Sequence, residues 1–589
     1  MKLDPTTMKD WQIAEAAEEN MKSTEELGEE LGLQNDEVLP QGQHLARVDY
    51  AKIMDRLESE NQTSSKYIDV TCITPTPLGE GKTTTVIGLI EGFGELGKKV
   101  TGAIRQPSSG PTFNIKGSAG GGGLAQVIPL APYSIRLTGD IDHITNAHNL
   151  AMVALTARMQ HEKNYDDAVL EKKGLKRLNI NPDRVQLRWA MDFCAQSLRY
   201  VTIGQGGRMD GRKMNSGFAI SASSELMAIL SITKSLKDMR ERIAKIVVAY
   251  DKKGDEITTA DLEVDGAMMA WMVDTINPNL LQTIEGQPIF VHAGPFANIA
   301  IGQSSIIADL LATKLSEYHV TESGFGSDIG YEKFWNLKCR ESGLRPDAVV
   351  IVCTIRALKM HGGGPPVKPG APLSIEYTRE HLELLEGGCE NLIAHIEIVK
   401  KSGVHPVVCI NRYLTDTQAE LDMVKKIAET HGAKVACSEH WLKGGEGAIE
   451  LAEAVIEACE EPNDFKFLYD LDTPLKTRID TIAKQIYGAK GVTYTPRAQR
   501  RLKSLQKNSN VHKLGTCMVK THLSLSHDPD LKGRPQNWDL PIQDFMVYKG
   551  AGFVVPVAGD IKLMPGTASD PAYRRIDVDI ETGKVTGLF

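Results

Sequence analysis

Residues 74–85 read Thr74-Pro-Thr-Pro-Leu-Gly-Glu-Gly-Lys-Thr-Thr-Thr85, and this stretch decides how the rest of the chain is interpreted. An apolar run rich in β-branched residues, 67–73, leads into it, and an amphipathic helical pattern, 83–93, follows it. Such a strand–loop–helix unit points backbone N–H groups and a helix N-terminus at an anion. The pattern predicts a phosphate-binding loop, and the alternative is an ordinary βα turn rich in Gly and Pro.

The spacing of this loop nearly matches the nucleotide-binding pattern G-x-x-x-x-G-K-[ST], with Thr76 in place of the first Gly. In that pattern Lys82 would neutralise β/γ-phosphate charge, and the Thr83 hydroxyl would coordinate Mg²⁺.

Composition excludes several classes of protein. The chain has 589 residues and a net charge of −9, whereas a nucleic-acid-binding domain usually carries a basic excess. Nine cysteines without a C-x-x-C pair suggest neither a disulfide framework nor a zinc knuckle. No apolar stretch approaches the roughly 18–20 residues of a membrane span, and the N-terminus lacks a signal-peptide core. We therefore expect a cytoplasmic protein without a membrane or nucleic-acid partner.

Short β-branched runs alternate with helical patterns from residue 66 onward, after a charged and helical N-terminal arm. This alternation predicts an α/β fold, with a large P-loop-type doubly wound, mostly parallel sheet and smaller additional α/β domains. The candidate strands are 67–73, 99–104, 200–203, 246–250, 288–292, 347–354, 404–410 and 433–437. Breaks rich in Gly and Pro suggest a nucleotide-binding domain over 1–365, a second domain over 366–462 and a C-terminal domain over 463–589.

A second glycine-rich segment, 105–126, follows the candidate strand that ends at Ile104. Ligand sites in open α/β sheets lie at the carboxyl ends of strands, so Arg105 could face the same phosphate as Lys82. Its planar guanidinium fits oxyanions. The glycines between 117 and 123 would let a loop close over a ligand. The alternative is a flexible surface loop in which Arg105 forms a structural ion pair.

Motifs along the chain resemble the formate–tetrahydrofolate ligase family, also called formyltetrahydrofolate synthetases, from about residue 30 to the last residue. The loop at 74–83 follows the family pattern T-P-x-G-E-G-K-[ST], which accounts for the absent first Gly. The other matching segments are 105–108, 116–122, 137–140, 294–300, 321–328, 356–363, 411–417, 441–447, 550–553 and 587–589.

The resemblance implies ATP-dependent ligation of formate to tetrahydrofolate through formyl phosphate, giving 10-formyltetrahydrofolate, ADP and phosphate. It assigns ATP to Thr76, Pro77, Leu78, Gly79, Glu80, Gly81, Lys82 and Thr83. Lys82 and Arg105 would stabilise charge leaving the γ-phosphate and then the formyl phosphate. The resemblance also implies Mg²⁺ with ATP, activation by a monovalent cation (K⁺ or NH₄⁺) and a homotetramer.

The predicted folate pocket depends on fewer residues. Tyr413 and Trp441 stand where the family has folate-stacking aromatics, and a pterin has a flat face that suits an aromatic platform. Gln126 and Asp140 match positions expected to meet polar groups of the ligand. Without the resemblance, core packing or loop anchoring is the more common role for a residue such as Tyr413.

Departures from the family pattern cluster at polar positions. An imidazole and an amide are replaced by Ile301 and Ser304, a carboxylate by Ala219, and the usual His moves by one place in Asp142-His143. Gln106 replaces a frequent Glu, and an expected Asn-Asp-Arg is replaced around residues 191–196. A divergent paralogue with another carboxylate or acceptor, and a catalytically weak nucleotide-binding regulator, therefore remain as alternatives. A metal site at Asp140, His143 and His148 is disfavoured, because its spacing fits no helix motif of metal ligands.

Overall fold

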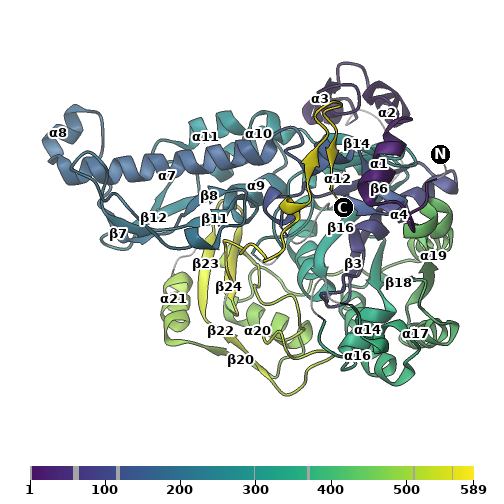
Figure 1. Cartoon of the computed structure of the whole chain (residues 1–589). Coiled ribbons are helices and arrows are strands. Elements are labelled where there is room, and N and C mark those ends of the chain that lie inside the picture. Colours follow the sequence, from purple (N-terminus) through teal and green to yellow (C-terminus); the bar gives the residue numbers. More distant parts are fainter. Residues whose placement is uncertain are drawn as a thin grey trace.

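A computed structural model describes residues 3–57, 65–114, 120–297, 299–367, 372–507, 511–559 and 561–588. Its centre is a 12-stranded sheet (Figure 1). Seven neighbouring strands are parallel, and they are β15 (Pro288–Val291), β4 (Val100–Ile104), β16 (Tyr318–Gly326), β3 (Lys66–Cys72), β17 (Ala348–Cys353), β18 (His405–Asn411) and β19 (Lys434–Ser438). Beyond β15 the pairing becomes antiparallel, through β14 (Asn279–Thr283), β2 (Ala46–Val48) and β1 (Val38–Pro40), while β6 (Ala125–Ile128) joins β14 and β5 (Gly121–Gly122) joins β6.

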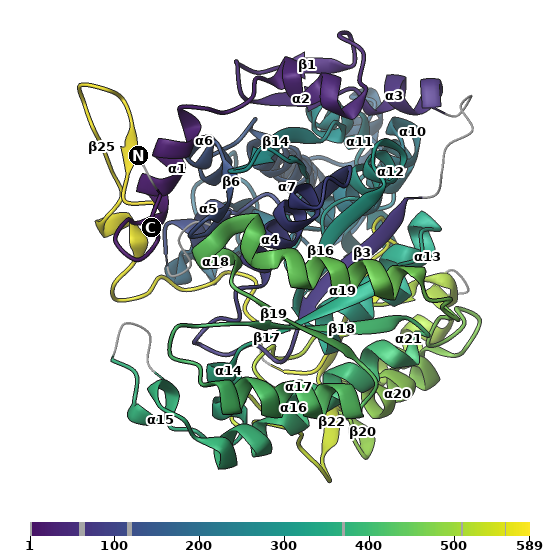
Figure 2. The ribbon, with the colours of Figure 1, turned by 90° about the vertical axis from the view of Figure 1, so that its right-hand side faces the viewer.

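Helices cover both faces of the parallel part, which is why its strands are nearly continuous apolar runs. Residues of β17 alternate between two cores: Ile351 packs with the group that contains α14 (Ile355–His361) and α16 (Leu382–Lys401). Val350 packs with the group that contains α4 (Lys82–Glu95) and α19 (Ile449–Glu460). Figure 2 shows α19 crossing in front of the sheet, with α16 and α17 (Gln418–Thr430) below. The mixed α/β architecture with a large, mostly parallel sheet agrees with the prediction.

All eight candidate strands are strands, with ends that differ by at most one residue. Two of them, β9 (Val201–Ile203) and β12 (Val247–Asp251), belong to small separate sheets instead of the central one. The prediction of a helical N-terminal arm is incomplete. This N-terminal segment contains α1 (Asp10–Glu18), α2 (Thr24–Leu31) and α3 (Tyr50–Leu57). Strands β1 and β2 also form there, because β14 offers β2 an edge to pair with.

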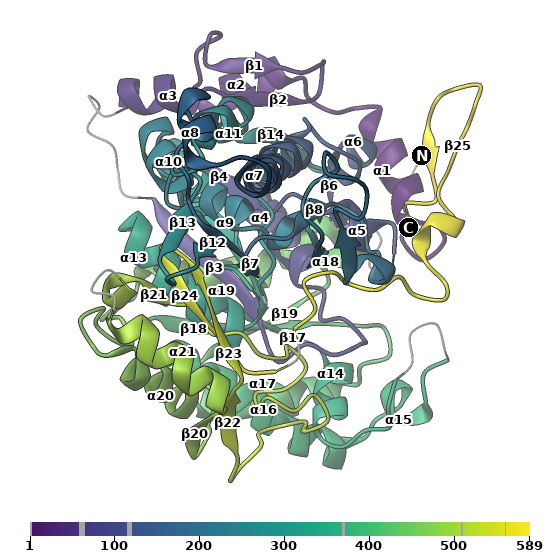
Figure 3. The ribbon, with the colours of Figure 1, turned by 90° about the vertical axis from the view of Figure 1, so that its left-hand side faces the viewer.

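An elongated segment, residues 140–273, projects from the sheet and is called the arm below (Figures 1 and 3). Its helices are α7 (Asp140–Asn164), α8 (Asp167–Lys172), α9 (Glu225–Ile232), α10 (Leu236–Ile243) and α11 (Asp265–Met272). Its strands are β7 (Ile180–Val185), β8 (Trp189–Met191), β9, β10 (Met214–Ser216), β11 (Phe218–Ile220), β12 and β13 (Glu256–Thr258). The long α7 gives the arm its length.

The C-terminal part forms its own small sheets. It contains α20 (Leu475–Gln485), α21 (Pro496–Lys507), β20 (Gly491–Tyr494), β21 (Gly515–Thr516), β22 (Asp539–Ile542), β23 (Asp544–Tyr548) and β24 (Phe553–Val557). The last strands, β25 (Asp577–Val578) and β26 (Val585–Thr586), lie beside α1, where Ala14 and Leu588 share a small core (Figures 2 and 3). Strands β18 and β19, from the predicted second domain, lie in the central sheet. The three-part division of the chain stays a prediction.

Candidate active site

The predicted phosphate-binding loop connects β3 to α4 at the carboxyl edge of the parallel strands. Gly81 has a φ of 73°, a left-handed conformation that favours glycine, and α4 begins at the next residue, Lys82. The loop is also held from a neighbouring strand, because Asn411 at the end of β18 donates from Nδ2 to the Glu80 carbonyl at 3.0 Å. Lys82 and Thr83 therefore occupy the first turn of a fixed helix.

Thr76, which stands in place of the first Gly, has a structural partner inside the loop. Its backbone N–H and its hydroxyl both donate to Glu80 Oε1, at 2.8 and 2.9 Å. Burial raises the pKa of the Glu80 carboxyl to about 7, although these hydrogen bonds oppose the rise. A side-chain contact between Thr76 and Glu80 thus closes the loop.

Lys82 and Arg105 converge on one carboxylate, Glu322. Lys82 Nζ lies 2.7 Å from Oε2, and Arg105 Nε lies 3.2 Å from Oε1. The Thr83 hydroxyl donates to Oε2 at 3.1 Å. Burial alone would raise the pKa of Glu322, but the two cations hold it well below its ordinary value. The three charges form a desolvated group in which a carboxylate fixes the two cationic side chains.

The order of the strands explains this convergence. Strand β16 lies between β3 and β4, which are successive in the chain, and β16 carries Glu322. Lys82 follows β3 and Arg105 follows β4, so Glu322 reaches both from the strand in the middle. A change in strand order of this kind marks the usual ligand site of an open α/β sheet. Sequence analysis missed Glu322, although its segment was among the matching motifs, because about 240 residues separate it from Lys82.

These side chains border a cavity of about 560 Å³. The loop supplies Thr76 and residues 79–84, the segment after β4 supplies Arg105 to Ser108, and the end of β16 supplies Glu322 and Phe325. The sequence analysis also missed His522, which comes from the C-terminal part. Its ring stacks on Phe325 with centroids 4.3 Å apart and planes 17° from parallel. Pro77 and Leu78 are not among the lining residues.

Gln126 and Asp140 are buried and bonded to protein groups. Gln126 donates from Nε2 to the carbonyls of Gly123 and Asp10, at 2.8 and 3.1 Å. Asp140 accepts from Arg47 Nη2 at 2.5 Å and from Asn279 Nδ2 at 3.0 Å, and neither it nor Gln126 lines the cavity. A structural role therefore accounts for the contacts of Asp140.

The two predicted folate-stacking aromatics, Tyr413 and Trp441, are not among the residues that line the cavity. The Arg356 guanidinium lies 4.0 Å from the centre of the Tyr413 ring. Trp441 is 37% exposed, and its carbonyl accepts from the backbone N–H of Leu124 at 2.9 Å, close to Gly121 in the cavity wall. The glycine-rich loop adjoins Trp441, but residues 115–119 of its predicted closing segment lie outside the described residues.

Most departures from the family pattern lie away from the cavity. Ile301 is buried, Ser304 donates to the His292 carbonyl at 3.1 Å, and Ala219 lies in β11 of the arm. Asp142 pairs with Arg136 on the surface. Gln106 is the one of the replaced residues that lines the cavity.

Among the described residues, the structure shows neither a group of three metal-ligating side chains nor a helix suited to cross a membrane. No cluster of three His, Cys, Asp or Glu side chains there could hold a metal ion, and His148 is bonded to the Arg188 carbonyl at 2.7 Å. Within the same ranges, none of the helices combines the length and apolar character needed to cross a membrane.

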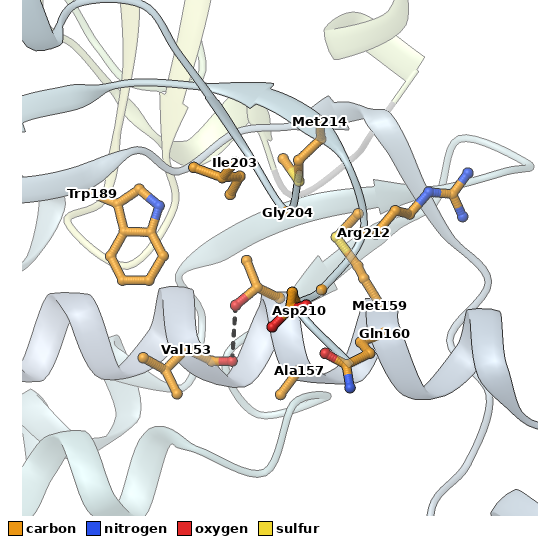
Figure 4. Close-up of a pocket in the computed structure, with 12 residues that line it drawn as sticks. Val153, Ala157, Met159, Gln160, Trp189, Ile203, Gly204, Asp210, Arg212 and Met214 are labelled. Carbon is orange, nitrogen blue, oxygen red and sulfur yellow. Dashed lines mark hydrogen bonds between the residues drawn. The ribbon is translucent and has the colours of Figure 1, made fainter. Parts of the chain in front are cut away.

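A second cavity, of about 320 Å³, lies in the arm and has a different character. Trp189, Ile203 and Met214 face the α7 side chains of Val153 and Met159 (Figure 4). Asp210 and Arg212 are the charged residues in its lining. No group of converging charges comparable to Lys82, Arg105 and Glu322 is present among these residues.

The fold and the cavity define an α/β protein in which a lysine, an arginine and a glutamate converge at the carboxyl edge of the sheet. The sequence profile of the family "Formate–tetrahydrofolate ligase" matches residues 8–589, so the chain belongs to that family. It is 64% identical to the formate–tetrahydrofolate ligase of Dehalococcoides mccartyi, over all of this chain and 98% of the relative. The formate–tetrahydrofolate ligases of Desulforapulum autotrophicum and Desulfosudis oleivorans are 61% and 57% identical, over the full length of both chains.

Proposed function

We infer that this protein ligates formate to tetrahydrofolate with ATP, through formyl phosphate, and releases 10-formyltetrahydrofolate, ADP and phosphate. The observation that carries this inference is the convergence of Lys82 and Arg105 on Glu322 in one cavity beside the loop. Full-length membership of the formate–tetrahydrofolate ligase family supports the same reaction.

The chemistry requires cations that neutralise a moving phosphoryl group. Formate is a poor electrophile, because its charge is delocalised and hydroxide is a bad leaving group. Transfer of the γ-phosphoryl group makes formyl phosphate, and phosphate then leaves when the folate amine attacks the formyl carbon. Such transfers depend on positioning and charge neutralisation. We assign Thr76 to Thr83 to ATP, and Lys82 and Arg105 to the charge that develops on the phosphoryl oxygens.

We assign Mg²⁺ to the triphosphate, near Thr83. The Thr83 hydroxyl and the Glu322 carboxylate lie 3.1 Å apart and are oxygen ligands of the kind that Mg²⁺ takes. One carboxylate is enough for an ion that substrate phosphates also hold. Activation by K⁺ or NH₄⁺ is part of the proposal, and comparing initial rates in K⁺, NH₄⁺ and Na⁺ salts at equal ionic strength tests it.

On the folate side we assign stacking to Tyr413 and Trp441, and polar contacts to Gln126 and Asp140. The exposed face of Trp441 and its position beside the glycine-rich loop support its assignment. Gln126 Oε1 is buried and has no hydrogen-bond partner in the described part of the chain, so its capacity as an acceptor is unused. Asp140 has weaker support, because both of its oxygens already have partners.

The decisive assay uses purified protein with ATP, formate and tetrahydrofolate, omitting each in turn. Formation of 10-formyltetrahydrofolate that requires all three substrates is the expected result. ADP release that is independent of folate would favour a paralogue with another acceptor. Tight ATP binding without turnover would favour a regulator, and either outcome would overturn the proposed reaction.

We also propose that the protein is a homotetramer and that the arm provides contacts between subunits. Of the 15 large apolar side chains that are exposed among the described residues, eight lie between 153 and 273. They include Tyr200 and Met209, which are 83% and 68% exposed. Apolar groups concentrated on one surface mark interaction sites. Sedimentation velocity should give a tetramer for the natural protein and smaller species for Tyr200→Asp combined with Met209→Asp; a natural monomer would contradict the proposal.

A further inference from the structure

The segment 105–112 forms a wall between the cavity and the arm. On one side, Arg105, Ser108 and Thr112 line the cavity. On the other side the arm packs closely. A Cβ atom added at Gly110 would lie 2.6 Å from Ile220 Cδ1 and 3.1 Å from Cys194 Sγ. The position of the wall therefore depends on the arm as well as on β4.

One side chain of the arm, Asp192, is bonded to this wall at two points. Its Oδ1 accepts a hydrogen bond from the Ser108 hydroxyl at 2.6 Å, and its Oδ2 accepts from the Ser109 backbone N–H at 2.7 Å. Hydrogen bonds to an ionised carboxylate are about twice as strong as neutral ones. Two bonds on successive residues fix both the position and the orientation of the wall.

Asn114, two residues beyond the far end of the wall, is bonded to the C-terminal segment. Asn114 donates from Nδ2 to the Gly566 carbonyl at 2.9 Å, and its Oδ1 accepts from the Ala568 N–H at 2.8 Å. Thr567 in turn donates to the Cys194 carbonyl at 2.7 Å. This segment therefore connects the wall to the same part of the arm, and Asp192 supplies the contact nearest to Arg105.

The bond to Asp192 also decides what Ser108 can offer to a ligand. A hydroxyl has one proton, and Ser108 uses this proton to donate its hydrogen bond to the Asp192 carboxylate. The oxygen remains as an acceptor. Ser108 therefore suits an N–H donor, such as an amine of the folate, better than an oxygen of phosphate or formate.

We propose that Asp192 is a positioning residue of the active site, which holds Arg105 and Ser108 in place and makes Ser108 an acceptor for an N–H group of the folate. Asp192 acts through the wall and does not touch the nucleotide loop. This inference rests on the ligase activity proposed above.

The test compares Asp192→Asn, Ser108→Ala and the double variant in the complete assay. We expect kcat/KM for tetrahydrofolate to fall about tenfold to hundredfold in each single variant. The double variant should lose little more than the worse single variant, because the two side chains act together. The dissociation constant for ATP, measured by titration without formate and folate, should change less than twofold.

The matched control is Asp251→Asn. Asp251 also lies on the arm and accepts three backbone N–H bonds, from residues 253–255, but these belong to its own turn. The Asp251→Asn variant should keep the kcat/KM of the natural protein for tetrahydrofolate.

Unchanged kcat/KM in Asp192→Asn and Ser108→Ala would overturn the proposal, and so would equal losses in ATP binding and in folate kinetics. If Asp192→Asn does not fold, Ser108→Ala decides the question alone. If the natural protein does not ligate formate, the proposed function is wrong. If the natural protein does ligate formate but Asp192→Asn keeps its kcat/KM for tetrahydrofolate, only the inference about Asp192 is wrong.

Discussion

The predicted phosphate side of the site and the predicted folate side are built in different ways. On the phosphate side, Lys82 at the start of α4 and Arg105 just after β4 both lie within 3.2 Å of Glu322 in β16. On the folate side, Trp441 is partly exposed, whereas Asp140 is held by Arg47 in a buried ion pair. The comparison teaches that a residue at a family position contributes to a site only if its polar atoms remain available to a ligand.

The largest effect is expected on the phosphate side. Lys82→Ala or Arg105→Ala should lower kcat by roughly 100-fold or more, because one fixed donor to a developing oxyanion contributes ~3–4 kcal/mol. Steady-state kinetics with all three substrates measure this, and Lys98→Ala, at an exposed lysine after α4, is the control. Near-normal turnover in either variant would remove that residue from the phosphoryl-transfer role.

Glu322→Gln should have the next largest effect. A neutral amide cannot fix both cations, so we expect kcat to fall about tenfold to hundredfold, the range for a hydrogen bond to a charged group. The KM for ATP should not rise, since the variant removes negative charge from the vicinity of the triphosphate. The control is Glu317→Gln, at an exposed position just before β16. A normal kcat would show that the carboxylate is dispensable for orienting Lys82 and Arg105.

A smaller effect is expected for Trp441→Ala. Loss of one stacking partner, at ~0.5–1.5 kcal/mol, should raise the KM for tetrahydrofolate about twofold to tenfold and leave the KM for ATP unchanged. Leu414→Ala, which shortens an exposed apolar side chain beside Tyr413, is the control. Equal changes in both KM values would show that Trp441 supports the loop and does not bind folate.

Asp140→Asn should affect folate kinetics least. Removing one partner of a buried ion pair should lower the free energy of unfolding by about 3–5 kcal/mol, because the Arg47 charge is left uncompensated. Below the unfolding temperature, the KM for tetrahydrofolate should rise only about twofold, because a folate group would share Asp140 oxygens that already have protein partners. Chemical denaturation and steady-state kinetics measure the two effects. An unchanged KM together with the loss of stability would remove Asp140 from the proposed folate contacts.

Local patterns predicted much of the fold. The run before the loop became β3, and the helical pattern after it became α4, because apolar periodicity and glycine placement act over short distances. The same reasoning found β17 and β18, whose residues are buried on both faces. It did not find β16, in which Glu322 and Ser323 interrupt the apolar pattern. It also could not tell that β9 and β12 belong to the arm, since strand pairing depends on contacts that are distant in the chain.

The sequence by itself determined the family, the loop between β3 and α4, and the presence of a lysine at the start of that helix and of an arginine just after the next strand. Only the tertiary structure decided that β16 lies between β3 and β4, so that Glu322 joins the two cations. It also decided that Asp140 faces Arg47 and that Asp192 reaches Ser108 from the arm. The physical reason is that hydrogen bonds and ion pairs depend on distances of about 3 Å, and the chain sets such distances only after it has folded.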